Sequence, residues 1–202
     1  MATLKERIHA HHIRTNAHHK GPNLLSLRHE SISGEEFHET FRGIDLVGAH
    51  FKYCDFRNAD FRDTSLRGTS FLACELREAE FLIAYMRGVR FIGCDLKGAN
   101  LNHSDLSGAF FSQTNINDCH LWDVTGNNQE IKNISHLPLW RIVYTARDLQ
   151  IGCRRYRIAD WHKFSDAEIS AMDIDALDWW KEYKEEIFSV IERFPAIPTG
   201  FE

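Results

Sequence analysis

The sequence of 202 residues contains no apolar run long enough to span a bilayer, and its first residues lack the hydrophobic core of a signal peptide. We therefore expect a cytoplasmic protein without membrane contact. Cysteine is scarce, and an odd number of five without an export signal favours reduced thiols over a disulfide framework. An excess of basic charge is also absent, because the formal net charge is -5, which disfavours direct binding to nucleic acid.

Signatures of catalysis are absent as well. The chain has no glycine-rich phosphate loop, no HExxH motif and no CxxC pair. Cys153 lies near Asp160 and His162 in the sequence, but it ends an alternating apolar segment, and such a cysteine is typical of a packed core rather than of a nucleophile. We therefore expect no catalytic residue, no resident metal and no cofactor, and we interpret the chain as a protein that is not an enzyme.

What the sequence does contain is a repeat of five residues. A large apolar residue occupies every fifth position from Phe41 to Leu121 without a polar exception. An α-helix buries a residue every three to four positions and a half-buried strand every two, so neither explains a strict five. Two positions before each large residue lies a second register, which is mostly small and begins Ala49, Cys54, Ala59, Thr64, Thr69. Both registers point inward only if the chain turns a corner after each pentad and coils.

Like residues also recur in columns at a spacing of twenty. One column holds Gly48, Gly68, Gly88 and Gly108, and another holds Cys54, Cys74 and Cys94. A three-sided coil would repeat after fifteen residues and break both columns. A repeat of twenty residues therefore fits these columns better than one of fifteen, and glycine suits a corner that requires an unusual φ or a close approach of backbones. We interpret the cysteine column as core packing rather than a metal or disulfide site, because small residues fill that register all around the coil.

The pentads "ADFRD", "CELRE", "CDLKG", "ANLNH" and "SDLSG" resemble the A(D/N)LXX units of pentapeptide-repeat proteins. The resemblance covers Phe41 to about Asp123. It implies an all-β solenoid, a right-handed quadrilateral β-helix in which four pentads make one coil, and hence about four coils here. Such a stack requires caps at both ends, because the terminal coils would otherwise expose apolar cross-sections and unpaired strand edges.

We divide the chain into three parts. Residues 31-126 form the β-helix, and the segment "SISGEEFHETF" leads into its first coil. Residues 127-202 form a small α+β cap. Residues 1-30 form a polar arm, for which a mobile state is favoured over metal binding by its imidazoles. The histidines of this arm are His9, His11, His12, His18 and His19.

The cap is predicted to hold a hairpin and two helices. In the segment "LWRIVYTARDLQIGC", apolar residues occupy every second position in two stretches that are separated by a turn, which indicates two short strands. Ser165 and Glu168 match a capping box, with Phe164 and Ile169 as a hydrophobic staple, and a longer helix is expected from Ile174 to Phe194. The segments "LQIGC" and "ALDWWKEYK" resemble the tail of uncharacterised pentapeptide-repeat proteins of bacteriophages and prophages, a resemblance that implies no established activity.

The candidate sites lie in the outward columns. Leu72 and Ile92 stack on one face, with Phe110 above and Tyr53 at the lower corner, and Tyr85 lies on another face. Because an exposed apolar column costs solubility, we expect these residues to bind a protein partner, unless the tail folds back over the column. We also expect a homodimer that forms through the C-terminal helix. The aromatic residues of this helix could lie at a dimer seam as readily as in an internal core; they are Trp179, Trp180 and Phe188.

Two functions remain open. The first is a non-enzymatic protein-interaction module, which the phage-like tail would make an inhibitor of a host protein or defence system. The second is implied by the quinolone-resistance pentapeptide proteins, in which an acidic rod resembles duplex DNA and binds DNA gyrase. Basic residues alternate with the acids of this rod, and for that reason the first function is favoured. The phosphate-like charges would come from Asp55, Asp60, Glu75, Glu80 and Asp95.

Overall fold

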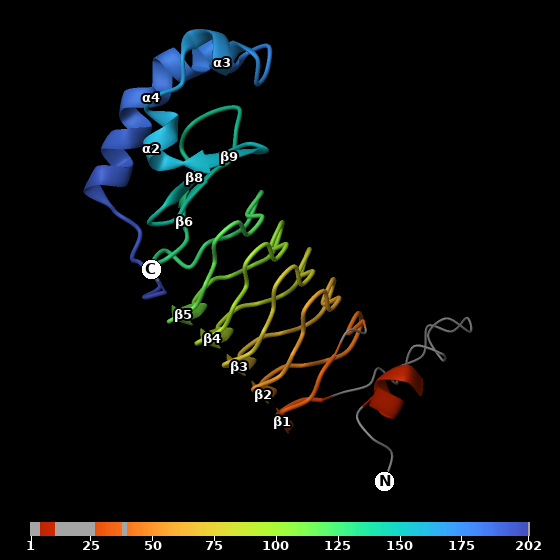
Figure 1. The fold of residues 1–202 in the computed structure, drawn as a ribbon. Coiled ribbons are helices and arrows are strands. Elements are labelled where there is room, and N and C mark those ends of the chain that lie inside the picture. Colours follow the sequence, from red (N-terminus) through yellow and green to blue (C-terminus); the bar gives the residue numbers. More distant parts are fainter. Residues whose placement is uncertain (1–4, 11–26, 38–39, 202) are drawn as a thin grey trace.

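The computed structural model describes residues 5–10, 27–37 and 40–201, and it shows a coiled rod closed at one end by a sheet and helices (Figure 1). The chain winds coil by coil along the rod, and the sheet and helices lie beyond the last coil (Figure 1). Residues 5–10 lie at the opposite end of the rod. The repeat therefore forms the middle of the molecule, and its flanks lie at the two ends.

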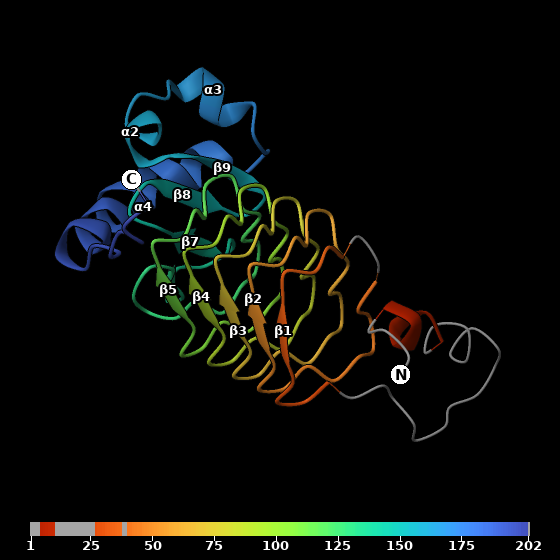
Figure 2. The same ribbon diagram turned by 60° about the horizontal axis from the view of Figure 1, so that its bottom comes forward.

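Four ladders of backbone bridges define the four walls of the rod. One wall is a parallel sheet in the order β1 (Ser31–Ser33), β2 (His50–Lys52), β3 (Ser70–Leu72), β4 (Arg90–Ile92), β5 (Phe110–Ser112) (Figure 2). Single bridges build the other walls at a spacing of twenty residues, as in Asp45↔Ser65, Asp55↔Glu75 and Asp60↔Glu80. The predicted four-sided solenoid of about four turns is therefore confirmed, and Gly68 follows Gly48 in its column.

Both inward registers are buried. Rings of the large register stack along the rod: Phe71 lies 5.2 Å from Phe51 and 5.2 Å from Phe91 between centroids, with interplanar angles of 17° and 10°. The small register leaves room for these rings and also satisfies backbone carbonyls, because Thr69 Oγ1 donates to the Leu46 carbonyl oxygen at 2.7 Å. A buried hydroxyl without such a partner would cost free energy, so threonine fits where the coil below presents a carbonyl.

The rod begins before the repeat becomes regular. β1 pairs with β2 in parallel, and Phe37 is fully buried in the same core as the later pentads. The Glu36↔Asp55 bridge spans nineteen residues (55 − 36), one fewer than the bridges above it. This first coil is one residue short, which explains why the strict five-residue frame starts only at Phe41. The lead-in segment is thus a layer of the rod rather than only a cover for it.

The polar arm predicted for residues 1-30 is described only in part. Residues 5–10 are helical, Ile8 is buried with the core of the rod, and Arg7 pairs with Glu30 at 2.9 Å. These residues pack against the first coil, whereas a mobile arm was expected. The sequence did not predict this packing, because a single buried isoleucine gives no apolar periodicity. His9 is exposed. The other four histidines of the predicted arm lie outside the described residues.

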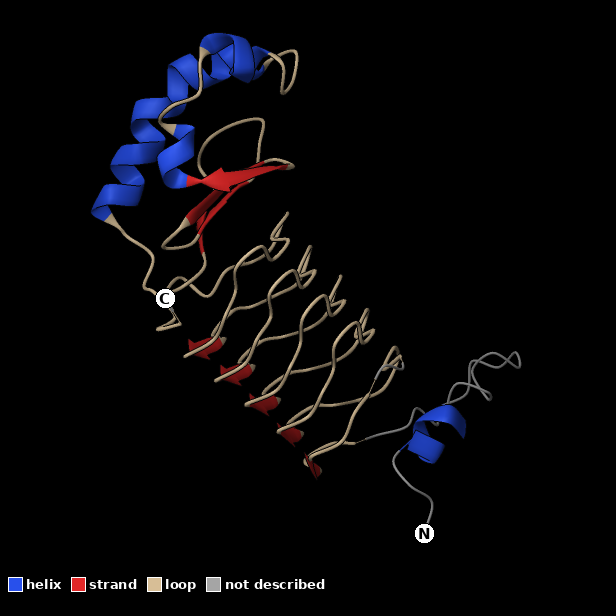
Figure 3. Cartoon of the chain, viewed as in Figure 1, coloured by secondary structure: helices blue, strands red, loops and turns tan. Residues whose placement is uncertain are grey.

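An antiparallel sheet covers the last coil. Its order is β6 (Lys132–Ile134), β7 (Ile142–Tyr144), β8 (Asp148–Ile151), β9 (Arg154–Arg157), and the predicted hairpin is β7 and β8 (Figure 3). One face of this sheet lies on the rod: Val143 joins the core of the rod, and Gln150 Oε1 accepts a hydrogen bond from the Leu121 backbone N–H at 3.3 Å. The other face carries Ile142 and Leu149 against the helices.

Three helices pack on the outer face of that sheet: α2 (Ile158–Trp161), α3 (Asp166–Ser170) and α4 (Ala176–Arg193). The predicted capping box precedes α3, because Ser165 Oγ accepts from the Glu168 backbone N–H while the Glu168 carboxylate accepts from the Ser165 backbone N–H. The aromatic residues of α4 that were expected at a dimer seam are buried inside the cap; these are Trp179, Trp180 and Phe188. The homodimer itself stays a prediction. None of the helices in the described ranges combines the length and apolarity that crossing a bilayer requires.

Candidate partner-binding surface

The wall formed by β1 to β5 presents the predicted apolar residues. Side chains before and after each buried centre point outward, because successive residues of a strand face opposite sides. None of the outward residues on β2 to β5 is acidic, although the chain has a formal net charge of -5. These residues are His50, Lys52, Ser70, Leu72, Arg90, Ile92, Phe110 and Ser112.

Leu72 and Ile92 are direct neighbours on the adjacent parallel strands β3 and β4. Both are half-buried. Lys52 lies below them in the same column and Ser112 lies above them. The two aliphatic side chains therefore form a compact apolar spot with polar residues at both ends, which we call the Leu72–Ile92 spot.

Two exposed aromatic rings flank this spot, each held by a cation. Phe110 is in register with Arg90 rather than with Ile92, so it lies in the neighbouring column, and the Arg90 guanidinium is 5.1 Å from its ring centroid. Tyr53 occupies the corner after β2, where Lys52 Nζ lies 5.0 Å from its ring centroid. The exposed fractions of the two residues are 40% and 61%. The cation–π contacts hold both rings at the wall without covering them fully.

Tyr85 does not join this surface. It bridges Ser65 on the neighbouring wall, beyond the glycine corner, and it is 58% exposed. A single partner that contacts both Tyr85 and the Leu72–Ile92 spot would have to wrap around that corner. The wall that carries Tyr85 instead has a groove of about 980 Å³ with a basic lining that includes Arg28, Arg67 and Arg87.

The C-terminal tail leaves the Leu72–Ile92 spot open. The Thr199 carbonyl oxygen accepts from the Gln113 backbone N–H at 2.6 Å, and Thr199 Oγ1 donates to the Thr114 carbonyl oxygen at 2.6 Å. These bonds fasten the tail to the corner that follows β5, while the cap lies beyond the last coil (Figures 1 and 2). Of the two alternatives for the apolar column, the described residues therefore display the uncovered one.

The acids expected to imitate phosphates are engaged by basic side chains on their own wall. Asp55 pairs with Arg57 at 2.5 Å. Arg77 lies 2.6 Å from Asp95 and 3.7 Å from Glu75. The acid and base columns expected from the twenty-residue spacing thus meet in ion pairs, and their potentials largely cancel at a distance.

On the next wall Asp60 also pairs with an arginine, whereas Glu80 has a neutral amide partner. Arg62 Nε and Nη2 donate to the two carboxylate oxygens of Asp60 at 2.8 Å, and Asn100 Nδ2 donates to Glu80 Oε2 at 2.8 Å. Partial burial raises the pKa of Asp60, but the hydrogen bonds and charge of Arg62 outweigh it, so the pKa lies below its ordinary value. A partner that requires free carboxylates would have to break these contacts.

The repeat also has known counterparts. A family model described as a pentapeptide repeat region matches residues 36–111. The resemblance drawn from the pentads is therefore confirmed, whereas the resemblance of the cap to phage tails stays a prediction. No curated protein matches the chain.

Solved structures of pentapeptide repeat proteins are similar to about half of the chain. Full-length QnrB1, a plasmid-mediated fluoroquinolone resistance protein, has 20% identity and a TM-score of 0.35, over 50% of this chain and 70% of that one. Rfr23 from the cyanobacterium Cyanothece 51142 has 17% identity and a TM-score of 0.34, over 50% of this chain and 84% of that one. HetL from Nostoc sp. strain PCC 7120, involved in heterocyst differentiation regulation, has 11% identity and a TM-score of 0.19, over 63% and 94%.

The cysteines divide into two groups. Cys54, Cys74, Cys94 and Cys119 are buried free thiols in the rod, and burial raises the pKa of Cys119 to about 12. Cys153 is exposed, which corrects its assignment to a core: the strand ends at Ile151, and Gly152 turns the chain with a φ of 55°. The ring of His162 stacks on Phe188 at 3.7 Å between centroids rather than serving as a base for this thiol. Among the described residues, no group of three or more metal-ligating side chains converges.

One basic cluster was not predicted from the periodicity. β9 carries Arg154, Arg155 and Arg157 at the rim of a groove between the cap and the rod. The signal in the sequence is the run "RRYR" in a chain whose net charge is negative. Because this run does not alternate between apolar and polar residues, a search for strand periodicity passes over it.

Proposed function

We propose that this chain is a non-enzymatic protein-interaction module that binds its partner through the wall formed by β2 to β5. The observation that supports this function is the acid-free wall in an acidic chain, with the uncovered Leu72–Ile92 spot at its middle. The buried ring stacks behind the wall and the parallel strand ladder hold these side chains in fixed positions. A preorganised surface loses little conformational entropy on binding, which favours affinity.

The chemistry of the partner follows from the wall. The Leu72–Ile92 spot offers apolar area, while Lys52 and Arg90 add positive charge that no acid on the same wall offsets. An apolar patch with an acidic rim complements this arrangement, because charge complementarity speeds association and apolar burial supplies affinity. We therefore propose a protein partner of that composition and no direct contact with nucleic acid or membrane.

Affinity purification from the native cell tests this function. The tagged full-length protein is compared with the double variant Leu72→Asp/Ile92→Asp, and enriched proteins are quantified by mass spectrometry. The matched control is Val47→Asp/Leu82→Asp, which places the same charges on half-buried outward positions of two other walls. We expect the wild type and the control to enrich one common protein, and the Leu72→Asp/Ile92→Asp variant to lose it by about tenfold or more. If both double variants enrich the common protein equally, this wall does not bind it and the proposal is wrong.

Two finer statements belong to the same proposal. The phage-like segments of the cap support a phage-encoded inhibitor of a host protein or defence system, and this predicts that the captured partner loses activity when the purified protein is added.

A homodimer through α4 would have to use residues outside its buried face, since Trp179 and Trp180 face the cap core. Light scattering of the purified chain would reveal a monomer if no such contact exists.

The alternative function is a DNA mimic that binds DNA gyrase. The support for it is the pentapeptide repeat region itself, because a square rod can carry acids at regular intervals. The ion pairs of Asp55, Asp60 and Asp95 weigh against it, since they neutralise the charges that would replace phosphates. A gyrase supercoiling assay decides the matter: unchanged supercoiling at micromolar protein rejects the mimic, and inhibition or protection would favour it over the first function.

A further inference from the structure

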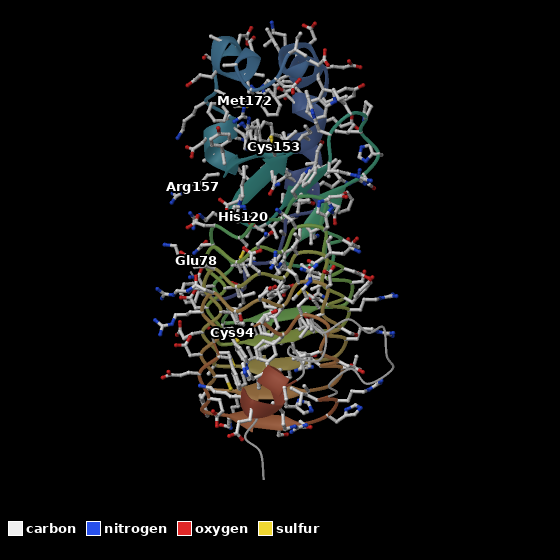
Figure 4. The ribbon with its side chains drawn as sticks, turned by 90° about the vertical axis from the view of Figure 1, so that its right-hand side faces the viewer. Glu78, Cys94, His120, Cys153, Arg157 and Met172 are labelled. Atoms are coloured by element: carbon white, nitrogen blue, oxygen red, sulfur yellow. The ribbon has the colours of Figure 1, made fainter. Side chains whose placement is uncertain are left out.

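β9 is an edge strand with a strongly basic sequence. It pairs only with β8 in the cap sheet, and it contributes three arginines within four residues. Figure 4 shows Arg157 at the edge of the molecule, above His120 of the last coil and below Cys153. Exposed edge strands invite pairing with another chain, so the surroundings of this edge decide what it can accept.

A groove of about 620 Å³ runs between this edge and the last coil of the rod. Its wall on the rod carries His120 and Trp122, and the Trp122 side chain is 44% exposed. Its lining includes Arg147, whose buried Nε has no hydrogen-bond partner among the described residues but lies 3.6 Å from Asp148 Oδ1. The groove is therefore basic and aromatic, and it is open along a strand edge.

The backbone of β9 has hydrogen-bonding groups available on this side. The Ile158 N–H donates to the Arg147 carbonyl at 3.0 Å. This bond shows which residue pairs of the β8–β9 ladder exchange backbone hydrogen bonds and which do not. In an antiparallel pair, bonded and non-bonded positions alternate, so Tyr156 bonds inward to β8 while Arg155 and Arg157 direct their N–H and C=O groups outward. Arg157 is the N-cap of α2, so its carbonyl oxygen accepts the first bond of that helix. Within the described chain, the N–H and C=O of Arg155 and the N–H of Arg157 have no other backbone partner on that side.

The charges of the groove do not balance. Its acids already have cationic partners: Asp148 lies 2.6 Å from Arg155, and Asp160 lies 3.3 Å from Lys163. Asp118 is 3.9 Å from Arg147. Arg154 donates to the Met172 carbonyl oxygen, and neither Arg154 nor Arg157 has an acidic partner among the described residues. Two exposed guanidinium groups thus remain on opposite faces of the open edge.

We propose that β9 binds an acidic, extended peptide segment as a further strand of the cap sheet. The added strand would satisfy the outward N–H and C=O of Arg155 and the N–H of Arg157, and its carboxylates would meet the guanidinium groups of Arg154 and Arg157. Nucleic acid fits less well, because phosphates accept hydrogen bonds but donate none, and the outward carbonyl of Arg155 needs a donor. This site is separate from the wall of β2 to β5 and does not depend on the function proposed for that wall.

Fluorescence anisotropy with the full-length protein tests this site. The probe is a labelled short peptide that repeats Glu-Glu-Val, which places carboxylates on both faces of the added strand. The double variant Arg154→Glu/Arg157→Glu should weaken its binding by about tenfold or more, because two charge-assisted contacts are lost and repulsion is added. The matched control Arg67→Glu/Arg87→Glu makes the same charge change on the wall of the rod and should leave the affinity within about twofold of the wild type. Circular dichroism confirms that both variants fold.

Two further probes separate strand addition from simple charge attraction. The same peptide methylated at alternate backbone nitrogens keeps its charge but cannot form the ladder, so it should bind at least about tenfold more weakly. A single-stranded oligonucleotide of similar length should bind more weakly than the peptide. Equal binding of the methylated peptide, tighter binding of the oligonucleotide, or equal loss in both double variants would each overturn the proposal.

Discussion

A single backbone feature recurs at each corner of the rod. Every fifth residue from Gly43 to Asp123 has a positive φ, in the range 50° to 73°. Glycine, asparagine and aspartate tolerate this left-handed region, and they occupy many of the corners. Ile83 does not suit it: its φ is 60°, and a β-branched side chain in that region is strained. The strain is local, because Ile83 is 46% exposed and contributes little to the core.

Replacing the strained side chain should therefore stabilise the protein. We expect Ile83→Asn to raise the free energy of unfolding by about 1 kcal/mol, since asparagine adopts the left-handed region at lower cost. For a chain of this size that corresponds to an increase in Tm of about 2–4 °C, measured by differential scanning fluorimetry. Leu82→Asn makes a comparable change one residue earlier, where φ is not positive, and should give no such gain. A Tm that falls in Ile83→Asn would show that the isoleucine packing outweighs the strain.

At the scale of elements, the rod is stabilised by columns of stacked rings. Phe51, Phe71, Phe91 and Phe111 form one column, and Phe41, Phe61 and Phe81 form another with centroids 4.7 and 4.9 Å apart. The spacing of hydrogen-bonded strands, about 4.8 Å, places each ring in contact with the rings above and below. Each ring therefore supports two coils, and its loss affects both neighbours.

Phe71→Ala tests this coupling. The change removes a ring that stacks on Phe51 and Phe91, and it leaves a cavity in an interior that cannot close. We expect the free energy of unfolding to fall by about 3–5 kcal/mol, measured by urea denaturation. Leu72→Ala on the same strand removes a half-buried outward side chain and should cost less than about 1.5 kcal/mol. Similar losses in both variants would mean that the wall, rather than the ring column, limits stability.

The elements differ in how clearly the sequence predicts them. The coil is predictable because each pentad repeats the same burial, and the stacking of Leu72 on Ile92 follows from the twenty-residue period. β6 and β9 are not, because three or four residues such as "KNI" and "RRYR" carry no alternating apolar pattern. The helix α4 and the capping box at Ser165 are predictable from periodicity and side-chain chemistry.

The candidate surface was predictable only in its apolar part. The twenty-residue columns separate the walls, so they give the position of Leu72 and Ile92 and the alternation of acids and bases. They do not give the side-chain conformations that pair Asp95 with Arg77 or set Arg90 on Phe110. Nor do they show where the tail ends, because Thr199 bonds to residues far from it in the chain.

The whole molecule is organised around the closure of the rod at both ends. At the lower end Ile8 completes the core, and at the upper end Val143 does so from the middle of the cap sheet. The cap is also joined to the last coil by polar contacts, in which Gln150 accepts from Leu121 and Arg147 donates to Asn117. A solenoid transmits stability between neighbouring coils, so damage at one end should spread from that end inward.

Val143→Asp tests whether damage at the capped end of the rod spreads inward from that end. Val143 is 1% exposed in the core of the rod, so a carboxylate there should lower the free energy of unfolding by about 4 kcal/mol and loosen the cap from the last coil. Hydrogen exchange followed by mass spectrometry should then show lost protection in residues 105–125, while residues 50–72 keep theirs. Ala146→Asp, at an exposed position in the turn between β7 and β8, is the control and should leave protection unchanged. If protection is lost equally along the rod, the cap and all coils unfold as one cooperative unit, and nearest-neighbour coupling is not the rule in this solenoid.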